Sequence, residues 1–332
     1  MKTIWSVIVP ALFALQEPAS ERKFPVLPDE ADPSSVRFSI DGKTIAYRVA
    51  HGKKWFVVVG DTKGEEFDDV KDLVVSPDCK TVGYAAKAGK KWLMVIGATK
   101  GPEYFGVSDL VFSDDGMRNA YVADEYPPAF HKQVILVDGK QQGSFEEISR
   151  PRMSRDGGLI AFTASSMGAW NPVTWRSGES GTLSDSTAVV RDGVRVSADG
   201  KRIIHIYAKK GTSSVTVGEN GPEFDAIGDL VISKDASSIA YAARTSDGTW
   251  SVVLGEKKGD PYDEIRSIVF GKDEKTLIYA ARKGKKFRIV AGDKTSDEFD
   301  AVGAPILSAD GLQVGFGAVN GREAFWKVIR LK

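Results

Sequence analysis

The stretch Leu73-Val-Val-Ser-Pro-Asp-Cys-Lys-Thr-Val-Gly-Tyr-Ala-Ala86 joins two apolar runs through a short turn rich in turn-forming residues. Related phrases recur along the chain of 332 residues, with anchors at Ser39, Ser76, Ser113, Ser154, Ser197, Ser233, Gly271 and Ser308. Successive anchors are 37, 37, 41, 43, 36, 38 and 37 residues apart. A period of about forty residues in a strand-rich sequence indicates a repeat architecture.

One repeat predicts four short antiparallel strands. Residues 73–76, 81–86 and 92–97 are apolar runs of strand length, separated by turn-forming residues. We expect a weaker fourth strand at 103–107, where an aromatic residue precedes a Val or Ile by three positions. Because this aromatic phrase and its carboxylates recur in most repeats, we interpret them as blade-to-blade packing and a solvated turn. Four such strands describe a propeller blade.

The two ends of the chain predict how the ring closes. The last repeat contains three strands between residues 305 and 331, one fewer than the template. We expect residues 24–31 to supply the missing outer strand, which removes an open sheet edge. The sequence therefore predicts an all-β fold, an eight-bladed β-propeller of four-stranded antiparallel blades closed by an N-terminal outer strand. The single propeller domain would span residues 24–332, and seven blades are the alternative.

The turn of the repeat predicts a left-handed backbone position. This position holds Gly42, Gly116, Gly157, Gly200 and Gly311, but Cys79, Ala236 and Glu274 in three other repeats. A residue other than Gly in the left-handed conformation costs about 1–2 kcal/mol. We therefore expect Cys79→Gly or Ala236→Gly to stabilise the protein by about 1 kcal/mol.

The repeat phrases at 39–47, 76–85 and 197–204 resemble the WD-like propeller repeats of TolB-type proteins. The resemblance covers almost all of residues 33–332. It implies a propeller that acts as a periplasmic binding or scaffolding module, or as a propeller attached to a hydrolase. The chain departs from the TolB pattern at the end of the third strand, in the outer strand and in having no separate N-terminal α/β domain. No hydrolase domain fits beside the repeats.

The first residues predict an export signal. Lys2 precedes an apolar run over residues 3–15, which is about the length of a signal-peptide core and too short to span a bilayer. We expect residues 1–20 to be a signal peptide and the protein to be periplasmic or secreted, and not membrane-spanning. The alternative is an N-terminal tail of a cytoplasmic protein.

Composition narrows the classes of function. The chain has 45 Lys and Arg residues and 45 Asp and Glu residues, and this zero net charge argues against a nucleic-acid partner. Cys79 is the single cysteine, so an intramolecular disulfide is impossible. The histidines, His51, His131 and His205, fall in different repeats without metal-ligand spacing. We expect a monomer with no cofactor, no metal and no catalytic residue that can be named.

The repeat pattern is interrupted in the third and fourth units, which carry longer second-to-third-strand connections at residues 124–131 and 165–186. Loops longer than the template are often functional. Because this connection emerges on the same face of every blade, we expect an aromatic lip on that face, formed by Tyr126, Phe130, His131, Trp170 and Trp175. The alternative is a loop excursion with Trp175 in the core as an ordinary third-strand residue.

The same connection is basic in other repeats. Its cations include Lys53, Lys90, Lys285 and Arg322, in blades that become neighbours once the ring closes. We expect a positive arc opposite the aromatic lip, with the acidic residues concentrated on the other face, near the aromatic-Asp turns. The alternative is a set of solvated turn lysines.

These observations favour an exported, non-enzymatic binding or scaffolding module whose partner is a protein, a glycan or a cell-envelope polymer. The first alternative is a carbohydrate-active hydrolase or lyase with its site in the central channel. The first-strand segments predict few charged groups there, with Arg37, Arg152 and Arg195 as the exceptions. The second alternative is a purely structural repeat protein.

Overall fold

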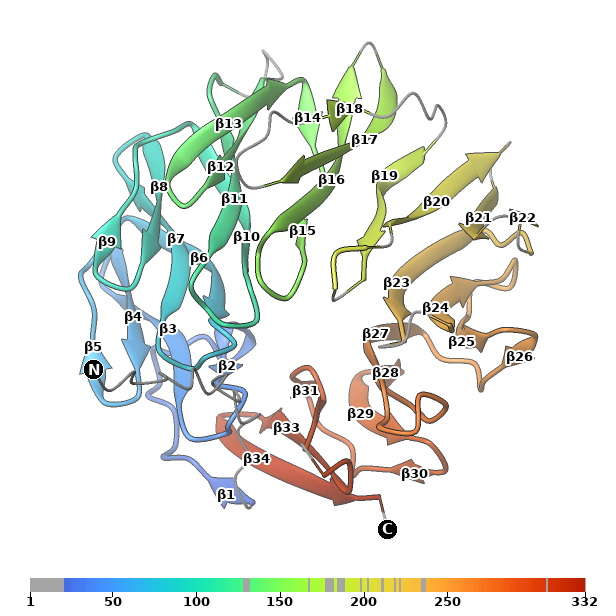
Figure 1. The fold of residues 1–332 in the computed structure, drawn as a ribbon. Helices are drawn as coiled ribbons and strands as arrows, with labels where there is room; N and C mark the ends of the chain where they lie inside the picture. Colours follow the sequence, from blue (N-terminus) through green and yellow to red (C-terminus); the bar gives the residue numbers. More distant parts are fainter. Residues whose placement is uncertain are drawn as a thin grey trace, which may run out of the picture.

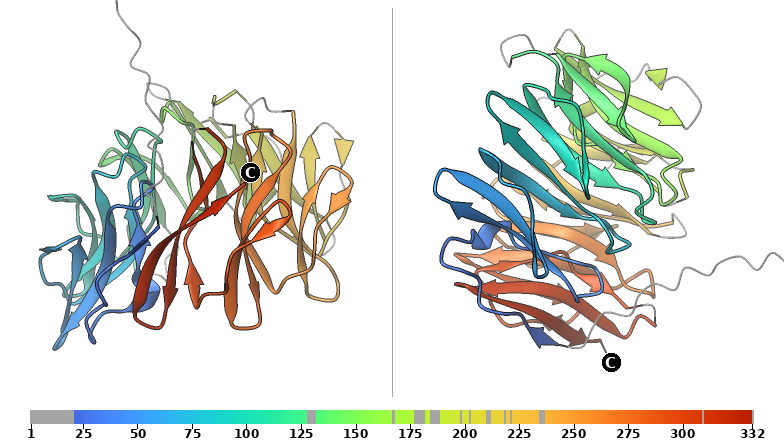
Figure 2. Two further views of the ribbon diagram at one scale, coloured as in Figure 1. Left: turned by 90° about the horizontal axis from the view of Figure 1, so that it is seen from below. Right: turned by 90° about the vertical axis from the view of Figure 1, so that its left-hand side faces the viewer.

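The computed structural model describes residues 21–127, 132–166, 168–176, 182–183, 189–197, 199–201, 203–209, 212–217, 219–220, 222–233, 237–308 and 310–331. These residues form eight antiparallel sheets around a common axis (Figure 1). Figure 2 shows the sheets standing side by side, with their strands running between the two faces of the ring. The fold is therefore an eight-bladed β-propeller, as the eight sequence anchors predicted, and the seven-bladed alternative is excluded.

The strand bounds are as follows. Blade one holds β2 (Arg37–Phe38), β3 (Ile45–His51), β4 (Lys54–Val59) and β5 (Thr62–Lys63). Blade two holds β6 (Asp69–Val75), β7 (Val82–Ala88), β8 (Lys91–Ile96) and β9 (Thr99–Lys100). Blade three holds β10 (Gly106–Phe112), β11 (Asn119–Asp124), β12 (Gln133–Val137) and β13 (Lys140–Phe145). Blade four holds β14 (Glu147–Ile148), β15 (Arg152–Met153), β16 (Leu159–Ser166), β17 (Ala169–Arg176) and β18 (Thr182–Leu183).

The second half of the ring repeats this order. Blade five holds β19 (Val189–Val196), β20 (Ile203–Lys209), β21 (Thr212–Val217) and β22 (Glu219–Asn220). Blade six holds β23 (Ala226–Ile232), β24 (Ile239–Arg244), β25 (Trp250–Leu254) and β26 (Lys257–Lys258). Blade seven holds β27 (Glu264–Phe270), β28 (Leu277–Lys283), β29 (Lys286–Ala291) and β30 (Lys294–Thr295). Blade eight holds β31 (Ala301–Val302), β32 (Ile306–Leu307), β33 (Gln313–Asn320), β34 (Glu323–Arg330) and β1 (Arg22–Lys23).

The second strand of each blade explains the apolar runs of the sequence. In β7, Tyr84 and Ala86 belong to the core cluster shared with blade one, while Ala85 belongs to the cluster shared with blade three. Because both faces of the strand are covered, its sequence is continuously apolar instead of alternating with polar residues. Small residues at these positions let neighbouring blades approach closely.

An edge-to-face aromatic pair lies between most neighbouring blades. Phe67, in the crossover from blade one, packs against Tyr84 of blade two at 6.3 Å and 69° between the rings. Equivalent pairs are Phe145–Phe162, Phe224–Tyr241, Tyr262–Tyr279 and Phe299–Phe316. Such pairs contribute about 0.5–1.5 kcal/mol beyond the burial of their surface. The packing role predicted for the recurring aromatic phrase is confirmed.

The fourth strand does not lie where the sequence predicted it. In blade two the outer strand is β9, directly after the Gly97-Ala98 turn, and the expected strand at 103–107 is wrong. Tyr104 makes a single bridge to Trp92, with both backbone hydrogen bonds at 2.8 Å, and the chain then crosses to the next blade. The residues from Gly106 onward are already the inner strand β10.

An N-terminal strand closes the ring, but it lies slightly earlier than predicted. Arg22 and Lys23 of β1 pair with β34, and the amide of Phe24 donates to Ala324 O at 3.0 Å. Residues 30–32 instead join blade one, where Ala31 bridges to Val49. The predicted outer strand at 24–31 is therefore shifted along the chain: β1 lies just before it, and Phe24 and Leu27 still donate backbone hydrogen bonds to blade eight. Leu27, which is 1% exposed, fills the seam between the two blades.

The turn after each inner strand has one shared geometry. Its Ser hydroxyl donates to the Asp carboxylate two residues later at 2.5 to 2.7 Å in blades one to five and eight. The predicted left-handed position is confirmed at each described site: φ is 61° at Cys79, 53° at Glu274 and 66° to 75° at the five glycines. Ala236 lies outside the described residues.

The described helical structure is a single 3-10 turn, η1 (Pro33–Ser35), which precedes β2 in blade one. Asp32 caps it by accepting the amide of Ser34 at 2.9 Å and the Ser34 hydroxyl at 2.6 Å. Within the described ranges, no helix is long and apolar enough to cross a membrane. The predicted signal peptide, residues 1–20, lies outside those ranges.

Candidate functional site

The second-to-third-strand hairpins and the crossovers between blades share one end of the ring, which we call the hairpin face. Antiparallel order within each blade places them there, because the second strand ends, the third begins and the fourth leaves at that end. The Ser-Asp turns lie at the opposite end, the turn face. Of the predicted site residues that the structure describes, all but Trp175 belong to hairpins of the hairpin face.

Three hairpins present a lysine at their tip. The first central residue of each hairpin turn is a glycine with positive φ, as a type II′ turn requires. The φ angle is 62° at Gly52, 62° at Gly89 and 63° at Gly284. The next residues are Lys53, Lys90 and Lys285, which are exposed and make no hydrogen bond or ion pair with the described part of the chain. These three predicted cations are therefore available to a partner.

The lysine that follows each tip is engaged. Lys54 Nζ lies 2.7 Å from Asp68, and Lys286 Nζ lies 2.7 Å from Asp300. Lys91 Nζ lies 3.1 Å from the centroid of the Phe105 ring. Each contact connects a hairpin to the crossover that enters the next blade, so the lysine beside each tip stabilises the ring.

Crossover carboxylates neutralise the hairpin face. Asp68 accepts the amide of Gly89 at 2.6 Å in addition to Lys54, and therefore joins blades one and two. Asp300 does the same for Gly321 and Lys286. The hydrogen bond from Lys54 and the amide of Gly89 lower the pKa of Asp68 below its ordinary value. The aromatic-Asp phrases were predicted on the opposite face, and this placement is wrong: Asp68 and Asp300 lie on the hairpin face, paired with its cations.

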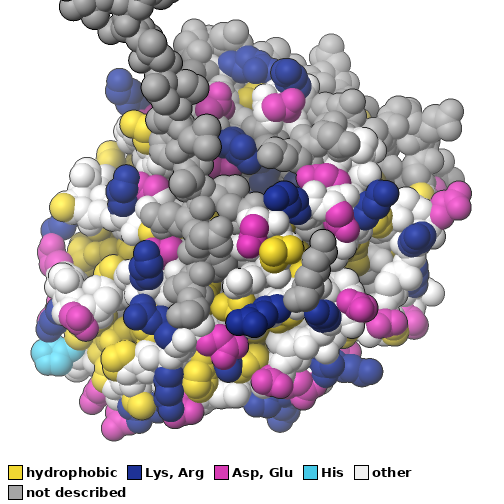
Figure 3. All heavy atoms as spheres, turned by 60° about the horizontal axis from the view of Figure 1, so that its bottom comes forward, with side chains coloured by type: hydrophobic (Ala, Val, Ile, Leu, Met, Phe, Trp, Pro, Cys, Tyr) yellow, Lys and Arg dark blue, Asp and Glu magenta, His cyan; other side chains and the backbone are white. Residues whose placement is uncertain are grey.

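The surface view agrees with these pairs. In Figure 3, Lys and Arg side chains alternate with Asp and Glu over the visible side of the ring instead of forming one basic patch. Arg322, predicted as part of the arc, is also engaged, because its Nε donates to Leu27 O at 3.1 Å and its guanidinium pairs with Asp29. Arg322 therefore anchors the N-terminal segment and is not one of the free cations of the hairpin tips.

The long connection of blade three presents Tyr126. This side chain is 47% exposed, and Lys132 Nζ lies 5.3 Å from the centroid of its ring. Lys132 also pairs with Glu125 at 2.6 Å, and this contact raises the pKa of Lys132. Phe130 and His131, the other predicted residues of this loop, lie outside the described residues.

The hairpin of blade four lies next to that of blade three. Gln133 of β12 donates to Asp124 at 2.8 Å and accepts the amide of Ile148 of β14 at 2.7 Å. Trp170 is the second residue of β17, which follows the blade-four hairpin; it is half-buried and pairs with Ser165. The Asp124–Gln133–Ile148 contacts thus link the base of the Tyr126 hairpin to β14, which pairs with β16 of the Trp170 hairpin.

Trp175 does not contribute to an aromatic lip. It is 9% exposed and belongs to the core cluster between blades three and four, where it lines a small apolar cavity with Ile135 and Phe162. The eight residues of β17 place Trp175 opposite Ile160, six positions from the hairpin end of the strand. The core alternative for this residue is therefore correct.

The inner strands, which surround the axis in Figure 1, carry more charge than predicted. Three inner strands carry an aspartate four residues before the Ser anchor, at the irregular point where the pairing with the second strand shifts register. These residues are Asp72, Asp109 and Asp229. Asp72 and Asp109 have positive φ, which Asp tolerates better than most residues. The sequence interpretation missed these residues because it began each inner strand after them; their fixed distance from the Ser anchor was the available signal.

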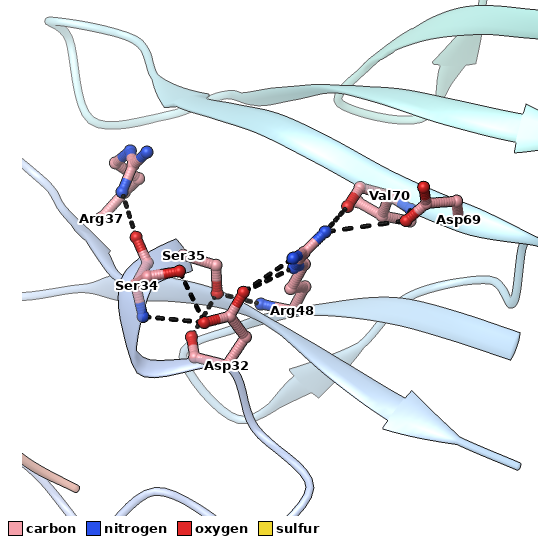
Figure 4. A network of polar contacts seen from close by, with 7 residues as sticks. All are labelled: Asp32, Ser34, Ser35, Arg37, Arg48, Asp69 and Val70. Carbon is pink, nitrogen blue, oxygen red and sulfur yellow. Dashed lines mark hydrogen bonds and ion pairs between the residues drawn. The ribbon is translucent and has the colours of Figure 1, made fainter. Parts of the chain in front are cut away.

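A polar network fixes the start of the first blade (Figure 4). The Arg48 guanidinium contacts Asp32 at 2.8 Å and Val70 O at 2.5 Å, and it stacks 4.6 Å from the Trp55 ring centroid. Asp69 lies 3.6 Å away. One arginine thus connects the N-terminal segment, blade one and blade two, and its two carboxylates balance its charge.

The described ranges contain no group of three or more His, Cys, Asp or Glu side chains placed to hold an ion. His51 lies 2.9 Å from Glu66 on the hairpin face. His205 lies 3.3 Å from the Tyr207 hydroxyl in blade five, and burial lowers its pKa. These two histidines belong to separate local contacts.

Comparison with known proteins supports the fold. No protein family and no curated protein matches the chain by sequence. Among solved structures, the Dos1 propeller is 10% identical and covers 93% of this chain and 94% of its own, with a TM-score of 0.53. The β-propeller domain of the Trilobed protease from Pyrococcus furiosus is 15% identical over 82% of this chain and 98% of its own, with a TM-score of 0.51. The fold is that of a β-propeller.

TolB from Acinetobacter baumannii is 14% identical and covers 88% of this chain and 77% of its own, with a TM-score of 0.44. At these identities the similarity of the β-propeller to solved structures concerns its architecture. Its function must be argued from its own residues.

Proposed function

We propose that this β-propeller is an exported, non-enzymatic binding or scaffolding module that binds its partner on the hairpin face of blades three and four. The partner is a protein, a glycan or a cell-envelope polymer. The observation that carries the proposal is the exposed Tyr126, on a hairpin that Gln133 links to β14, the strand that pairs with β16 of the Trp170 hairpin. Tyrosine and tryptophan are enriched at binding surfaces because they combine a large apolar area with a polar tip.

Charge on the same face supports a role in recognition. The free tips Lys53, Lys90 and Lys285 project from blades one, two and seven, while the cations beside them are paired. Isolated rim cations contribute more to orientation and association rate than to affinity. The aromatic hairpins would therefore supply affinity, and the lysine tips would orient a partner that extends across the face.

A carbohydrate-active enzyme with its site in the channel is less well supported. General acid–base catalysis needs two groups that converge on one bond. Asp109 already accepts the Ser108 hydroxyl at 2.9 Å, and Asp229 accepts the amide of Ser267 in the next blade. Both carboxylates have structural partners at the irregular points of the inner strands.

The test is capture of partners from an envelope extract and from cell-wall polysaccharide by the purified protein. We expect Tyr126→Ala combined with Trp170→Ala to abolish capture while the circular dichroism spectrum and melting temperature stay close to the original values. A matched control is Met117→Ala, because Met117 is 79% exposed but lies on the turn face. Undiminished capture by the folded double variant would exclude this face.

A further inference from the structure

The outer strand of blade three is longer than other outer strands of the ring. β13 runs over six residues, from Lys140 to Phe145, whereas β5, β9, β26 and β30 contain two residues each. It lies at the outer side of the ring (Figure 1), and in the described part of the chain one of its edges has no strand partner. An unpaired edge presents backbone N–H and C=O groups that can pair with another chain.

Other outer edges carry residues that discourage such pairing. In five blades a proline, a carboxylate or both stand directly before the crossover aromatic residue. These pairs are Glu65-Glu66, Pro102-Glu103, Pro222-Glu223, Asp260-Pro261 and Asp297-Glu298. Proline and charged side chains on an edge strand are common protection against pairing with another chain. Blade three has Gly143-Ser144 before Phe145, and therefore carries neither kind of protection.

The residue at the Gly143 position also closes the groove between two blades. In blade one this residue is Glu65, whose carboxylate lies 2.7 Å from Lys100 Nζ on the outer strand of blade two. Lys100 Nζ in turn lies 5.6 Å from the centroid of the Phe67 ring. Gly143 has no side chain with which to make such a contact, so the groove between blades three and four stays open at this point.

The small apolar cavity beside Trp175 lies in this open groove. It has about 290 Å³ of empty volume, part of it open to solvent. Ile135 and Phe162, both buried, form part of its wall, while the half-buried Gly143 and Phe145 bring it to the edge of β13. Ile135 is the direct pairing partner of Gly143. The unpaired edge and the cavity therefore form one continuous surface.

This combination determines what kind of occupant fits. In a strand added to β13, the residue opposite Gly143 points to the same face of the sheet and covers the glycine. Because the wall is apolar, that residue must be apolar as well. A second copy of β13 would offer Lys, Gln, Gly and Ser from residues 140–144, which do not match the cavity. The occupant is therefore a strand of different sequence.

We propose that the outer edge of β13 binds an extended segment of a partner polypeptide as an added strand, with one apolar side chain of that segment in the cavity at Gly143. In this mode of recognition, main-chain hydrogen bonds supply affinity and a pocket for a side chain supplies specificity. The site lies on the outer rim of blade three and does not depend on the Tyr126 and Trp170 hairpins.

The experiment uses two fluorescein-labelled heptapeptides, Thr-Ser-Thr-Leu-Thr-Ser-Thr and the same peptide with a central serine, and measures their binding to the full-length protein by fluorescence anisotropy. We expect the leucine peptide to bind with a Kd of about 100 μM, and the serine peptide at least about tenfold more weakly, because only leucine fills the apolar cavity. Hydrogen exchange should show that the bound leucine peptide protects amides of β13.

Two variants separate the edge from the cavity. Gly143→Val fills the cavity at a position where five other blades already carry a side chain, and Ser144→Glu supplies the carboxylate that blade one has at Glu66. Each should weaken binding of the leucine peptide by about tenfold while the melting temperature is preserved. Thr99→Glu adds the same charge to the outer strand of blade two and should leave binding unchanged. Tyr126→Ala should also leave it unchanged, which distinguishes this site from the hairpin face.

No binding of the leucine peptide to the original protein would overturn the proposal. Undiminished binding by both Gly143→Val and Ser144→Glu would overturn it as well. Sedimentation velocity tests the other occupant: a concentration-dependent dimer that Ser144→Glu abolishes would assign this edge to a second copy of the chain, against the proposal.

Discussion

At the scale of single residues, the repeat is governed by the left-handed position of its Ser-Asp turn. Five blades place Gly there, while Cys79 and Glu274 adopt φ of 61° and 53°. A Cβ added at Gly42, Gly116, Gly157 or Gly311 would collide with the preceding blade; at Gly116 it would lie 2.4 Å from an oxygen of Asp78, whereas at Gly200 the nearest atom is 3.4 Å away. The position is therefore constrained both by its backbone conformation and by contact between neighbouring turns.

A substitution at Glu274 tests the free-energy cost of a residue other than Gly at this left-handed position. We expect Glu274→Gly to raise the free energy of unfolding by about 1 kcal/mol, because Gly adopts positive φ without the clash of a Cβ. Urea denaturation of both proteins provides the measurement. The reverse control is Gly284→Ala, since Gly284 has φ of 63° with open space around its Cα; we expect it to destabilise by about 1 kcal/mol. Equal stability of Glu274→Gly and the original protein would contradict the strain argument.

At the scale of strands and hairpins, the sequence predicted the long second and third strands well, because continuous apolar runs identify strands that are covered on both faces. The sequence did not predict the outer strand correctly, because there a single pair of backbone hydrogen bonds decides whether a residue belongs to a strand. Tyr104 has the composition of a strand residue but makes one bridge before the chain crosses over. Lys54 and Asp68 are 14 residues apart in sequence, and their 2.7 Å contact depends on the approach of hairpin to crossover.

The blade-six hairpin predicts a pH dependence. Asp247 accepts the amide of Thr249 and the hydroxyls of Thr245 and Thr249, and these hydrogen bonds lower its pKa from 3.8 to about 2. A folded pKa below the unfolded one stabilises the native state above about pH 4, and this contribution is lost as the pH falls towards 2. We expect Asp247→Asn to flatten the dependence of the unfolding midpoint on pH between 4 and 2. A profile parallel to that of the original protein would show that the hairpin contributes nothing there.

At the scale of the whole molecule, the count of eight anchors sufficed to predict the number of blades, and the missing last strand sufficed to predict closure by the N-terminal segment. The exact residues could not be predicted, because Arg22–Lys23 is only two residues long and polar. Of the predicted aromatic lip, Tyr126 is exposed and Trp175 is buried, although both are aromatic residues of extended repeats. The register of β17 with β16 determines which side chains of β17 are buried. This register could not be predicted from the repeat, because blade four contains an insertion.

Closure of the ring makes the stability of the first and last blades depend on the same N-terminal segment. A substitution at Leu27 tests that dependence. Leu27 is 1% exposed between blades eight and one, whereas its neighbour Val26 is 60% exposed. We expect Leu27→Ala to lower the free energy of unfolding by about 2–5 kcal/mol, as removal of a buried leucine side chain does, and Val26→Ala to change it by less than about 0.5 kcal/mol. Hydrogen exchange should show the loss of protection first in β34 and β3, because the seam lies between their blades. A Leu27→Ala protein with the stability of the Val26→Ala control would mean that the ring is held closed by β1 and the Arg322 contacts without the buried side chain.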